Sequence, residues 1–409
     1  MFFKKIINFN KNYFSLLITL IFCSLPLPFL FSNIFSFLLI LYVFFYAIKF
    51  KVKPIFNRSN VLLIVLYSLM VLSYFWSIDK ELTLIGLQLK SAFLILPLLF
   101  CFIPKFSEKD IKNIFLSFSF AMGVYALFFI IKGLVDYFLT GSLVNLTRHE
   151  LVSPLNLNRI YVSLFTVTAI FNLVFHQKKE LLHKILLGLL VSFLLLLSSK
   201  TIILTSFAVF IYFKRSYIII RFKNQKVLFT IIFLIFSFIW FKYNPKFYTE
   251  LIPKKISEVL TKKDFEKNYY FNGAELRILY TKFLCELEKE ENIFFTGYGL
   301  NTSQVKINQK CVEYNLPDGY GTTYNFHNQY NQTLLELGVF GLVMLFIILF
   351  LAFKKALRNR SYFFITIFII ISILLLTESL FERQRGVYFF ILLSCLLFHI
   401  KDDSKIVLE

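Results

Sequence analysis

The sequence predicts an all-α, polytopic membrane protein of about twelve transmembrane helices with one large polar loop containing short helices. Hydrophobic residues make up 58% of the 409 residues, including 55 Phe, and the mean hydropathy is +0.70. Apolar runs long enough to cross a bilayer as helices recur along most of the chain, whereas barrel strands would be about ten residues of alternating character. The long polar segment at 243–328 interrupts this pattern.

The expected spans are apolar runs between charged connections. Pro26 and Pro28 divide the first block, because proline removes a helical hydrogen bond and restricts the residue before it. The run 181–213 is long for one helix and short for two. Two helices joined at 198–200 keep both flanking basic connections on one side. The expected spans are 13–31, 33–49, 60–77, 82–103, 111–135, 158–175, 181–198, 201–213, 226–242, 329–353, 362–380 and 386–400.

The net charge of +20 comes from basic residues that are distributed as in a membrane protein and not as on a nucleic-acid-binding surface. Basic residues gather in short connections, such as Lys49 and Lys51 and again Lys214 and Arg215, as the positive-inside rule requires. We therefore expect no nucleic-acid partner, both termini in the cytoplasm, an uncleaved first span that serves as a signal anchor, and the polar segment outside. The expected divisions are 1–242, 243–328 and 329–409.

The positions of the cysteines and histidines limit which disulfides and metal sites the chain can form. Cys285 and Cys311 lie in the polar segment, and a disulfide between them stays open because spacing alone cannot decide it. The five histidines are scattered without metal-ligand spacing, so we expect no metal and no cofactor. Walker-type and serine-hydrolase motifs are absent from the sequence, which disfavours ATP-driven transport and serine hydrolysis.

Within the polar segment, residues 275–290 have the periodicity of an amphipathic helix. Leu276, Leu279 and Phe283 recur at three- and four-residue spacing, and Arg277 lies beside this apolar stripe. The Thr-Gly-Tyr-Gly sequence at 296–299 predicts a tight turn, where glycine permits positive φ and close approach of the backbone.

Polar residues crowd the point where the chain re-enters the apolar region, beginning at His327. In a helix that starts there, Asn331, Gly338 and Gly341 lie within about 40° of His327, while Glu336 points to the opposite side. The glycines suit close helix packing. The N-terminus of a helix disfavours a cation, so a neutral histidine fits the role of a general base. The alternative is an interfacial histidine that bonds neighbouring loop carbonyls.

Two exterior cations, Arg277 and Lys200, suit a diphosphate ligand. Arginine forms paired hydrogen bonds with phosphate, and lysine acts as a point charge. The alternative for Lys200 is snorkelling from a short helix, and for Arg277 a surface ion pair with Glu275 or Glu286. Candidates for the same role are Arg159, Arg383 and Arg385.

Lys90 lies inside the span predicted at 82–103. A charge at that depth usually faces the interior of the bundle and has a partner. Glu336 and Glu378 are the candidate partners.

The ordered motifs together resemble the O-antigen ligase and polymerase family of bacterial membrane glycosyltransferases. The resemblance rests on His-Asn-Gln-Tyr at 327–330 and Glu-Leu-Gly-Val-Phe-Gly at 336–341, preceded by the arginine helix and the Gly-x-Gly turn. Leu-Ser-Ser-Lys-Thr at 197–201 is similar to the family's helix-hairpin tip, with lysine in place of the usual arginine. Glu-Ser at 378–379, with Glu-Arg-Gln at 382–384 and Gly386, resembles a late motif of some members. The resemblance covers residues 156–390.

The resemblance implies transfer of a glycan from undecaprenyl diphosphate to an acceptor sugar hydroxyl, on the periplasmic side of the bacterial inner membrane and without metal. Our hypothesis is that His327 assists acceptor deprotonation while Arg277 and Lys200 hold the leaving diphosphate. The implied partners are the lipid-linked glycan, lipid A core or another glycan acceptor, and membrane lipids. Further expected contacts with substrate are Arg159, Asn328, Tyr330 and Asn331, and the expected structural residues near the site are Glu336, Gly338, Gly341, Gly297 and Gly299.

Two other functions remain open at the level of sequence. A repeat-unit polymerase would share the same motifs, differing from a ligase in its acceptor. A lipid-linked glycan flippase or secondary transporter would fit the span count and intramembrane Lys90, but transporters tend to show repeated halves and broken helices near the midplane. Here the polar residues are concentrated in one exterior loop instead.

Overall fold

The structure is a computed structural model that describes residues 2–175, 180–221, 256–266, 269–317, 319–323 and 325–401. Over these residues the regular structure is helical, apart from an isolated bridge between Phe106 and Ile400. The helices are α1 (Phe2–Ser24), α2 (Phe29–Phe50), α3 (Arg58–Leu72), α4 (Lys80–Leu89), α5 (Ala92–Phe100), α6 (Glu108–Thr140), α7 (Arg148–Val152), α8 (Arg159–Phe175), α9 (Leu181–Leu197), α10 (Lys200–Arg221), α13 (Ile256–Thr261), α14 (Gly273–Glu291), α15 (Ser303–Glu313), α16 (Tyr320–Thr323), α17 (Gln329–Arg358), α18 (Tyr362–Leu374) and α19 (Gln384–Phe398).

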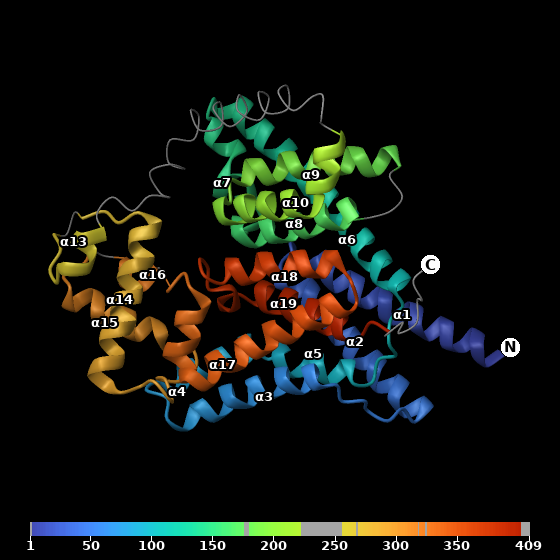
Figure 1. Cartoon of the computed structure of the whole chain (residues 1–409), viewed down its shortest axis with the longest axis horizontal. Coiled ribbons are helices and arrows are strands. Elements are labelled where there is room, and N and C mark those ends of the chain that lie inside the picture. Colours follow the sequence, from blue (N-terminus) through green and yellow to red (C-terminus); the bar gives the residue numbers. More distant parts are fainter. Residues whose placement is uncertain are drawn as a thin grey trace.

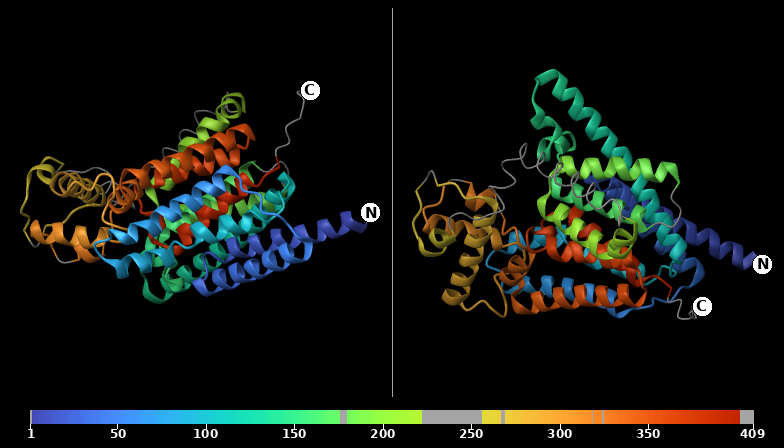
Figure 2. Two further views of the ribbon diagram at one scale, coloured as in Figure 1. Left: turned by 90° about the horizontal axis from the view of Figure 1, so that it is seen from below. Right: turned by 45° about the horizontal axis from the view of Figure 1, so that its top comes forward.

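Long helices run side by side through the molecule, as Figures 1 and 2 show. Helices α13 to α16 gather at one end, which we call the loop end. The start of α1 lies at the opposite end. Helices α17 and α19 both begin at the loop end and run away from it, so the connections that precede them lie beside the α13–α16 unit.

The chain has several helices that can cross a membrane. Within the described residues five stretches are long and apolar enough, and the pair formed by 148–155 and α8, which meet at a 91° bend, adds a sixth if the two together make one span. Shorter apolar helices accompany them: Asn12–Ser24, Leu181–Leu197, Lys200–Phe213, Tyr362–Leu374 and Gln384–Phe398. The count of twelve remains a prediction, and the span expected at 226–242 lies outside the described residues. The five long stretches are α2, Arg58–Phe75, Lys80–Phe100, α6 and α17.

Two predicted breaks between helices are confirmed. Helix α1 ends at Ser24 and Pro28 precedes the first turn of α2, so the division at the prolines holds, whereas the expected spans 13–31 and 33–49 are wrong because the break lies inside the first of them. Ser198 has φ 52°, a left-handed conformation that separates α9 from α10 as the topology argument requires. The span expected at 82–103 differs, because α4 ends before Lys90 and α5 begins after it.

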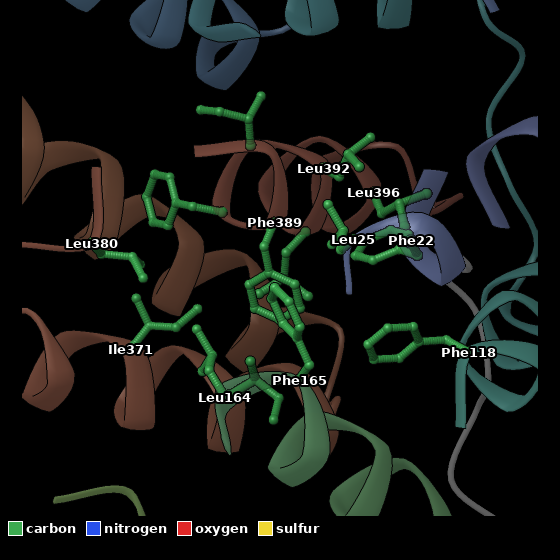
Figure 3. Close-up of a cluster of buried hydrophobic side chains, with 14 of the residues drawn as sticks. Phe22, Leu25, Phe118, Leu164, Phe165, Ile371, Leu380, Phe389, Leu392 and Leu396 are labelled. Atoms are coloured by element: carbon green, nitrogen blue, oxygen red, sulfur yellow. The ribbon is translucent and has the colours of Figure 1, made fainter. Parts of the chain in front are cut away.

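Aromatic side chains fill the centre of the bundle. Phe22 of α1 lies 6.1 Å from Phe389 of α19, and Phe165 of α8 lies 5.1 Å from the same ring, measured between centroids. Phe118 of α6 closes this cluster, which Figure 3 shows. Because each ring comes from a different helix, the cluster fixes α1, α6, α8 and α19 against one another.

The outward faces of the bundle are also apolar. On α2 the side chains of Phe37, Phe44 and Phe45 are 58%, 66% and 58% exposed. Such a continuous apolar face is unfavourable in water and suits hydrocarbon.

A second, smaller core holds the loop end together. The predicted amphipathic helix is confirmed as α14, whose Leu279, Tyr280 and Phe283 are completely buried. Phe326 and Leu335, which flank the start of α17, belong to the same core. The α13–α16 unit therefore packs directly on α17, the helix that re-enters the bundle. Cys285 is exposed and Cys311 is buried, and both are free thiols.

The long helix α17 is broken at Gly338, where φ is 65° and ψ is −170°. It also begins at Gln329 rather than at His327, with Asn328 as the capping residue. The expected helical face that joined His327 to Gly338 and Gly341 is therefore wrong, because His327 precedes the helix and Gly338 interrupts it.

Residues 294–301 supply hydrogen bonds that the broken helix lacks. Tyr298 N–H donates to Leu335 O at 2.8 Å, and Val339 N–H donates to Phe294 O at 2.7 Å. A free main-chain polar group is costly at membrane depth, so these bonds stabilise the break. The Gly-x-Gly turn and the glycine of α17 thus form one structural unit.

This unit leaves no room for a side chain at Gly338. A Cβ atom there would lie 2.1 Å from Phe295 O, and the positive φ adds strain for any residue with a Cβ. The contact is with main chain, which cannot rotate away.

We predict that Gly338→Ala lowers the free energy of unfolding by about 2–4 kcal/mol, through backbone strain and overpacking. Gly188→Ala is the matched control, since Gly188 lies on the exposed surface of α9 and a Cβ atom added there would have no neighbour within 4 Å. That substitution should leave stability unchanged or raise it by up to about 1 kcal/mol. Thermal unfolding in detergent measures both, and equal melting temperatures for the two variants would contradict the account.

Candidate functional site

Residues 375–383 join α18 to α19 at the loop end, and we call them the α18–α19 connection. Gln329, the first residue of α17, holds this connection at two points. Its N–H donates to Leu375 O at 2.8 Å, and its side-chain carbonyl accepts from Phe381 N at 2.8 Å. Gln329 is buried, so these bonds replace water for main-chain groups that need partners.

Arg277 reaches the α18–α19 connection from helix α14. Its Nε and Nη2 groups donate to Thr377 O at 3.1 and 2.8 Å, and its Nη1 group donates to Gly273 O at 2.7 Å. Carbonyl oxygens fix the guanidinium plane without cancelling its positive charge. The structure therefore holds a cation in a set orientation at the boundary between the loop unit and the bundle.

The first turn of α10 lies beside the same residue. Thr377 Oγ1 donates to Thr201 Oγ1 at 3.2 Å, and Lys200, next to Thr201, is half-buried. Arg277 therefore contacts the carbonyl oxygen of Thr377, and the first turn of α10, which carries Lys200, contacts its hydroxyl group. Arg159 is the first residue of α8, whose Tyr161 approaches the following part of the connection.

His327 lies next to Glu378 on the α18–α19 connection. Its Nδ1 atom is 3.5 Å from Glu378 Oε2, an ion-pair distance, and its side chain is 25% exposed while that of Glu378 is 5% exposed. The residue has φ 47°, and its N–H donates to Asn325 Oδ1 at 2.9 Å. No hydrogen bond joins these two atoms, so the contact is electrostatic and becomes an ion pair when the imidazole is protonated.

Three predicted substrate contacts have protein partners. Asn328 Oδ1 accepts from Tyr330 N and Asn331 N, at 3.0 and 3.2 Å, and so caps α17. Asn331 Nδ2 donates to Thr281 Oγ1 at 2.9 Å, which ties α17 to α14. Tyr330 Oη donates to Ser372 O at 3.0 Å. Each contact positions the segment around His327, and contact with substrate remains a prediction for all three residues.

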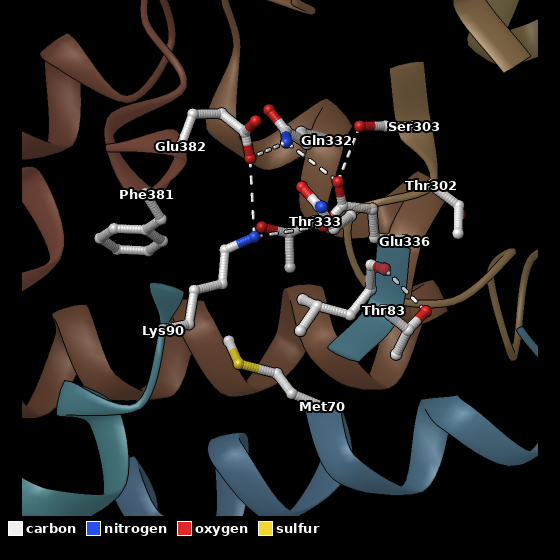
Figure 4. A network of polar contacts seen from close by, with 12 residues as sticks. Met70, Thr83, Lys90, Thr302, Ser303, Gln332, Thr333, Glu336, Phe381 and Glu382 are labelled. Atoms are coloured by element: carbon white, nitrogen blue, oxygen red, sulfur yellow. Dashed lines mark hydrogen bonds and ion pairs between the residues drawn. The ribbon is translucent and has the colours of Figure 1, made fainter. Parts of the chain in front are cut away.

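A buried charge cluster joins Lys90 to Glu336 of α17 and to Glu382 of the α18–α19 connection, as Figure 4 shows. Lys90 Nζ is 3.7 Å from Glu336 Oε2 and 3.5 Å from Glu382 Oε1. Gln332 Nε2 donates to both carboxylates, and Ser303 Oγ donates to Glu336 at 2.7 Å. The prediction that Glu336 partners Lys90 is confirmed, whereas Glu378 faces His327 and the second partner is Glu382.

The charged groups of this cluster are largely shielded from water. Lys90 is 2% exposed and Glu336 is 3% exposed, so neither charge is well hydrated. Burial raises the pKa of the Glu382 carboxyl, Lys90 opposes that shift, and Glu336 adds to it. Lys90 lies between α4 and α5 and is shared by two carboxylates, so it links this part of the chain to α17 and to the α18–α19 connection.

The α18–α19 connection is the part of the site that the sequence indicates least clearly. The sequence does not single out Thr377, and it marks Glu378 and Glu382 only through a late motif and, for Glu378, as a candidate partner of Lys90. The available signal is the cluster of polar residues at 377–385 between two apolar helices, a pattern that is costly at a membrane boundary unless the groups are used.

Residues 185–346 match the family model described as O-Antigen ligase. Among curated proteins, none matches the chain. The matched segment contains Lys200, Arg277, His327 and Glu336. The α18–α19 connection lies beyond its end.

We predict that Lys90→Met lowers the free energy of unfolding by about 3–5 kcal/mol, because it leaves two buried carboxylates without their cation. Lys112→Met is the control, since the Lys112 ion pair with Glu108 is exposed and such pairs contribute little. Adding Glu382→Gln to Lys90→Met should recover part of the loss. Melting temperatures measure the series, and a Lys90→Met protein as stable as the control would refute the structural role.

Proposed function

We propose, on the premise that residues 185–346 form a domain of the O-antigen ligase family of membrane glycosyltransferases, that this protein transfers a glycan from undecaprenyl diphosphate to an acceptor sugar hydroxyl. One observation carries the proposal. Arg277 and His327 contact the neighbouring residues Thr377 and Glu378, although α14 and the start of α17 are separate elements. A cation for the leaving group and a base for the acceptor thus lie at one place.

In the proposed reaction the acceptor hydroxyl oxygen attacks the anomeric carbon of the donor glycan. A new carbon–oxygen bond forms, and the bond from that carbon to the diphosphate oxygen breaks, with the electron pair leaving on the diphosphate. His327 Nε2 takes the hydroxyl proton. The Glu378 carboxylate, 3.5 Å from Nδ1, then faces an imidazolium cation and stabilises it.

Arg277 and Lys200 are proposed to bind the departing diphosphate. Negative charge grows on the diphosphate as the glycosidic bond breaks, so fixed cations stabilise the transition state more than the bound donor. Three hydrogen bonds to main-chain carbonyls already orient the Arg277 guanidinium, which lowers the cost of reorganisation. Lys200 contributes a point charge from the first turn of α10.

We place the loop end in the periplasm and the other end of the bundle in the cytoplasm. The basic residues Lys355 and Arg358 end α17, which runs away from the loop end, and Lys49 lies in the last turn of α2. This distribution follows the positive-inside rule. The divisions 1–242, 243–328 and 329–409 are part of the same proposal. Lipid A core is the proposed acceptor.

We predict that His327→Ala slows glycan transfer by about 10²–10⁴-fold, the usual contribution of a positioned general base. Arg277→Ala should slow it by about 10²–10³-fold, because one fixed donor to the developing charge is lost. Purified protein in lipid nanodiscs, given undecaprenyl-diphosphate-linked glycan and lipid A core, provides the rates.

Lys289→Ala is the control for both variants, since Lys289 is an exposed cation on the same helix as Arg277. It should transfer glycan at the parental rate. Full activity of the His327 or Arg277 variant, in protein that inserts and melts like the parent, would rule out the corresponding role.

A further inference from the structure

A cavity of about 270 Å³ lies between the bend at 148–159 and the start of α19. This volume is near the lower end of small-molecule pockets, about 300 Å³, so it suits a compact group rather than a long glycan. Its polar lining comes from both sides: His149, Asn156, Asn158, Tyr161, Arg383 and Arg385.

Arg383 and Arg385 give this cavity positive charge, and in the described part of the chain no carboxylate forms an ion pair with either of them. Within the described residues, neither Arg383 nor Arg385 has an acidic side chain within ion-pair distance, and none of the residues that line the cavity is acidic. Arg383 is exposed, whereas Arg385 is half-buried. Two like charges separated by one residue repel each other, and a bound anion would relieve that repulsion.

Arg385 is held in place by contacts that leave its charge uncompensated. Its Nε group donates to Leu25 O at 2.9 Å and its Nη2 group to Leu27 O at 3.0 Å. The guanidinium carbon also lies 4.3 Å from the centroid of the Phe29 ring. These partners orient the cation without a carboxylate, as a site for an external anion requires.

The cavity adjoins the α18–α19 connection that carries Glu378. Tyr161, which lines the cavity, has its hydroxyl 3.4 Å from Ser379 O and 3.3 Å from Leu380 O, and donates there. Gly386 lets these parts meet, since a Cβ atom on it would lie 2.7 Å from the Tyr161 ring. An anion in the cavity would therefore lie close to the main chain that positions the proposed base.

We propose that this cavity binds a phosphate group carried by the glycan acceptor, at a second anion site separate from Arg277 and Lys200, which hold the single diphosphate of the donor. The inference rests on the proposed function, because that function supplies the two substrates. Arginine forks bind phosphate oxygens in pairs, and the amides of Asn156 and Asn158 offer further donors or acceptors.

Inorganic pyrophosphate is the probe, and hydrogen exchange of residues 148–162 is the local readout in purified, full-length protein. We expect pyrophosphate to slow exchange in this segment, and Arg383→Gln to weaken its apparent affinity about tenfold, the loss of one charge-assisted contact. The Arg383 side chain is exposed and forms no ion pair within the described part of the chain, so this variant should fold. Lys289→Gln removes an exposed charge elsewhere and should bind like the parent.

Arg277→Ala separates this inference from the proposed function, because it should abolish rapid transfer yet keep pyrophosphate protection at 148–162. Repeating the titration with a phosphorylated glycan acceptor and, separately, with lipid-diphosphate-linked glycan identifies the substrate that brings the anion. Protection by the acceptor, weakened in Arg383→Gln, supports the proposal. Equal protection in Arg383→Gln and the parent, protection by the donor alone, or protection by pyrophosphate that the acceptor does not reproduce, would overturn it.

Discussion

The arrangement of the site depends on the main-chain hydrogen bonds of the α18–α19 connection. A non-helical segment at the edge of a membrane must satisfy its N–H and C=O groups within the protein. Gln329, Arg277 and Tyr161 provide partners for it from α17, α14 and α8. The same bonds bring three distant parts of the sequence together, so the contacts that satisfy the backbone also assemble the candidate site.

The break in α17 solves a related problem at Gly338. The helix must present Glu336 to buried Lys90, and it must also receive the 294–301 segment against its main chain. A regular helix would keep its carbonyls bonded internally. Breaking it at a glycine frees Leu335 O to bond the Gly-x-Gly turn. The α13–α16 unit is thereby attached to the bundle through main-chain hydrogen bonds as well as through its apolar core.

Much of this architecture follows from patterns that a sequence exposes directly. Proline positions and charge distribution predict the α1–α2 and α9–α10 boundaries, and three- and four-residue periodicity predicts α14. The break at Gly338 escapes such patterns because apolar periodicity continues through it, and its cause is a segment some forty residues earlier in the chain. Of the two candidate partners of Lys90, Glu336 is confirmed, whereas Glu378 faces His327, and the additional partner Glu382 comes near Lys90 only once the connection between α18 and α19 is folded.

The Glu378→Gln variant shows whether the α18–α19 connection orients His327 through Glu378. This change keeps the side chain's size and removes its charge. We expect kcat for glycan transfer to fall about 10²-fold while KM for the lipid-linked donor stays constant, with partial recovery in Glu378→Asp. Parental kcat in Glu378→Gln protein that inserts and melts normally would contradict it.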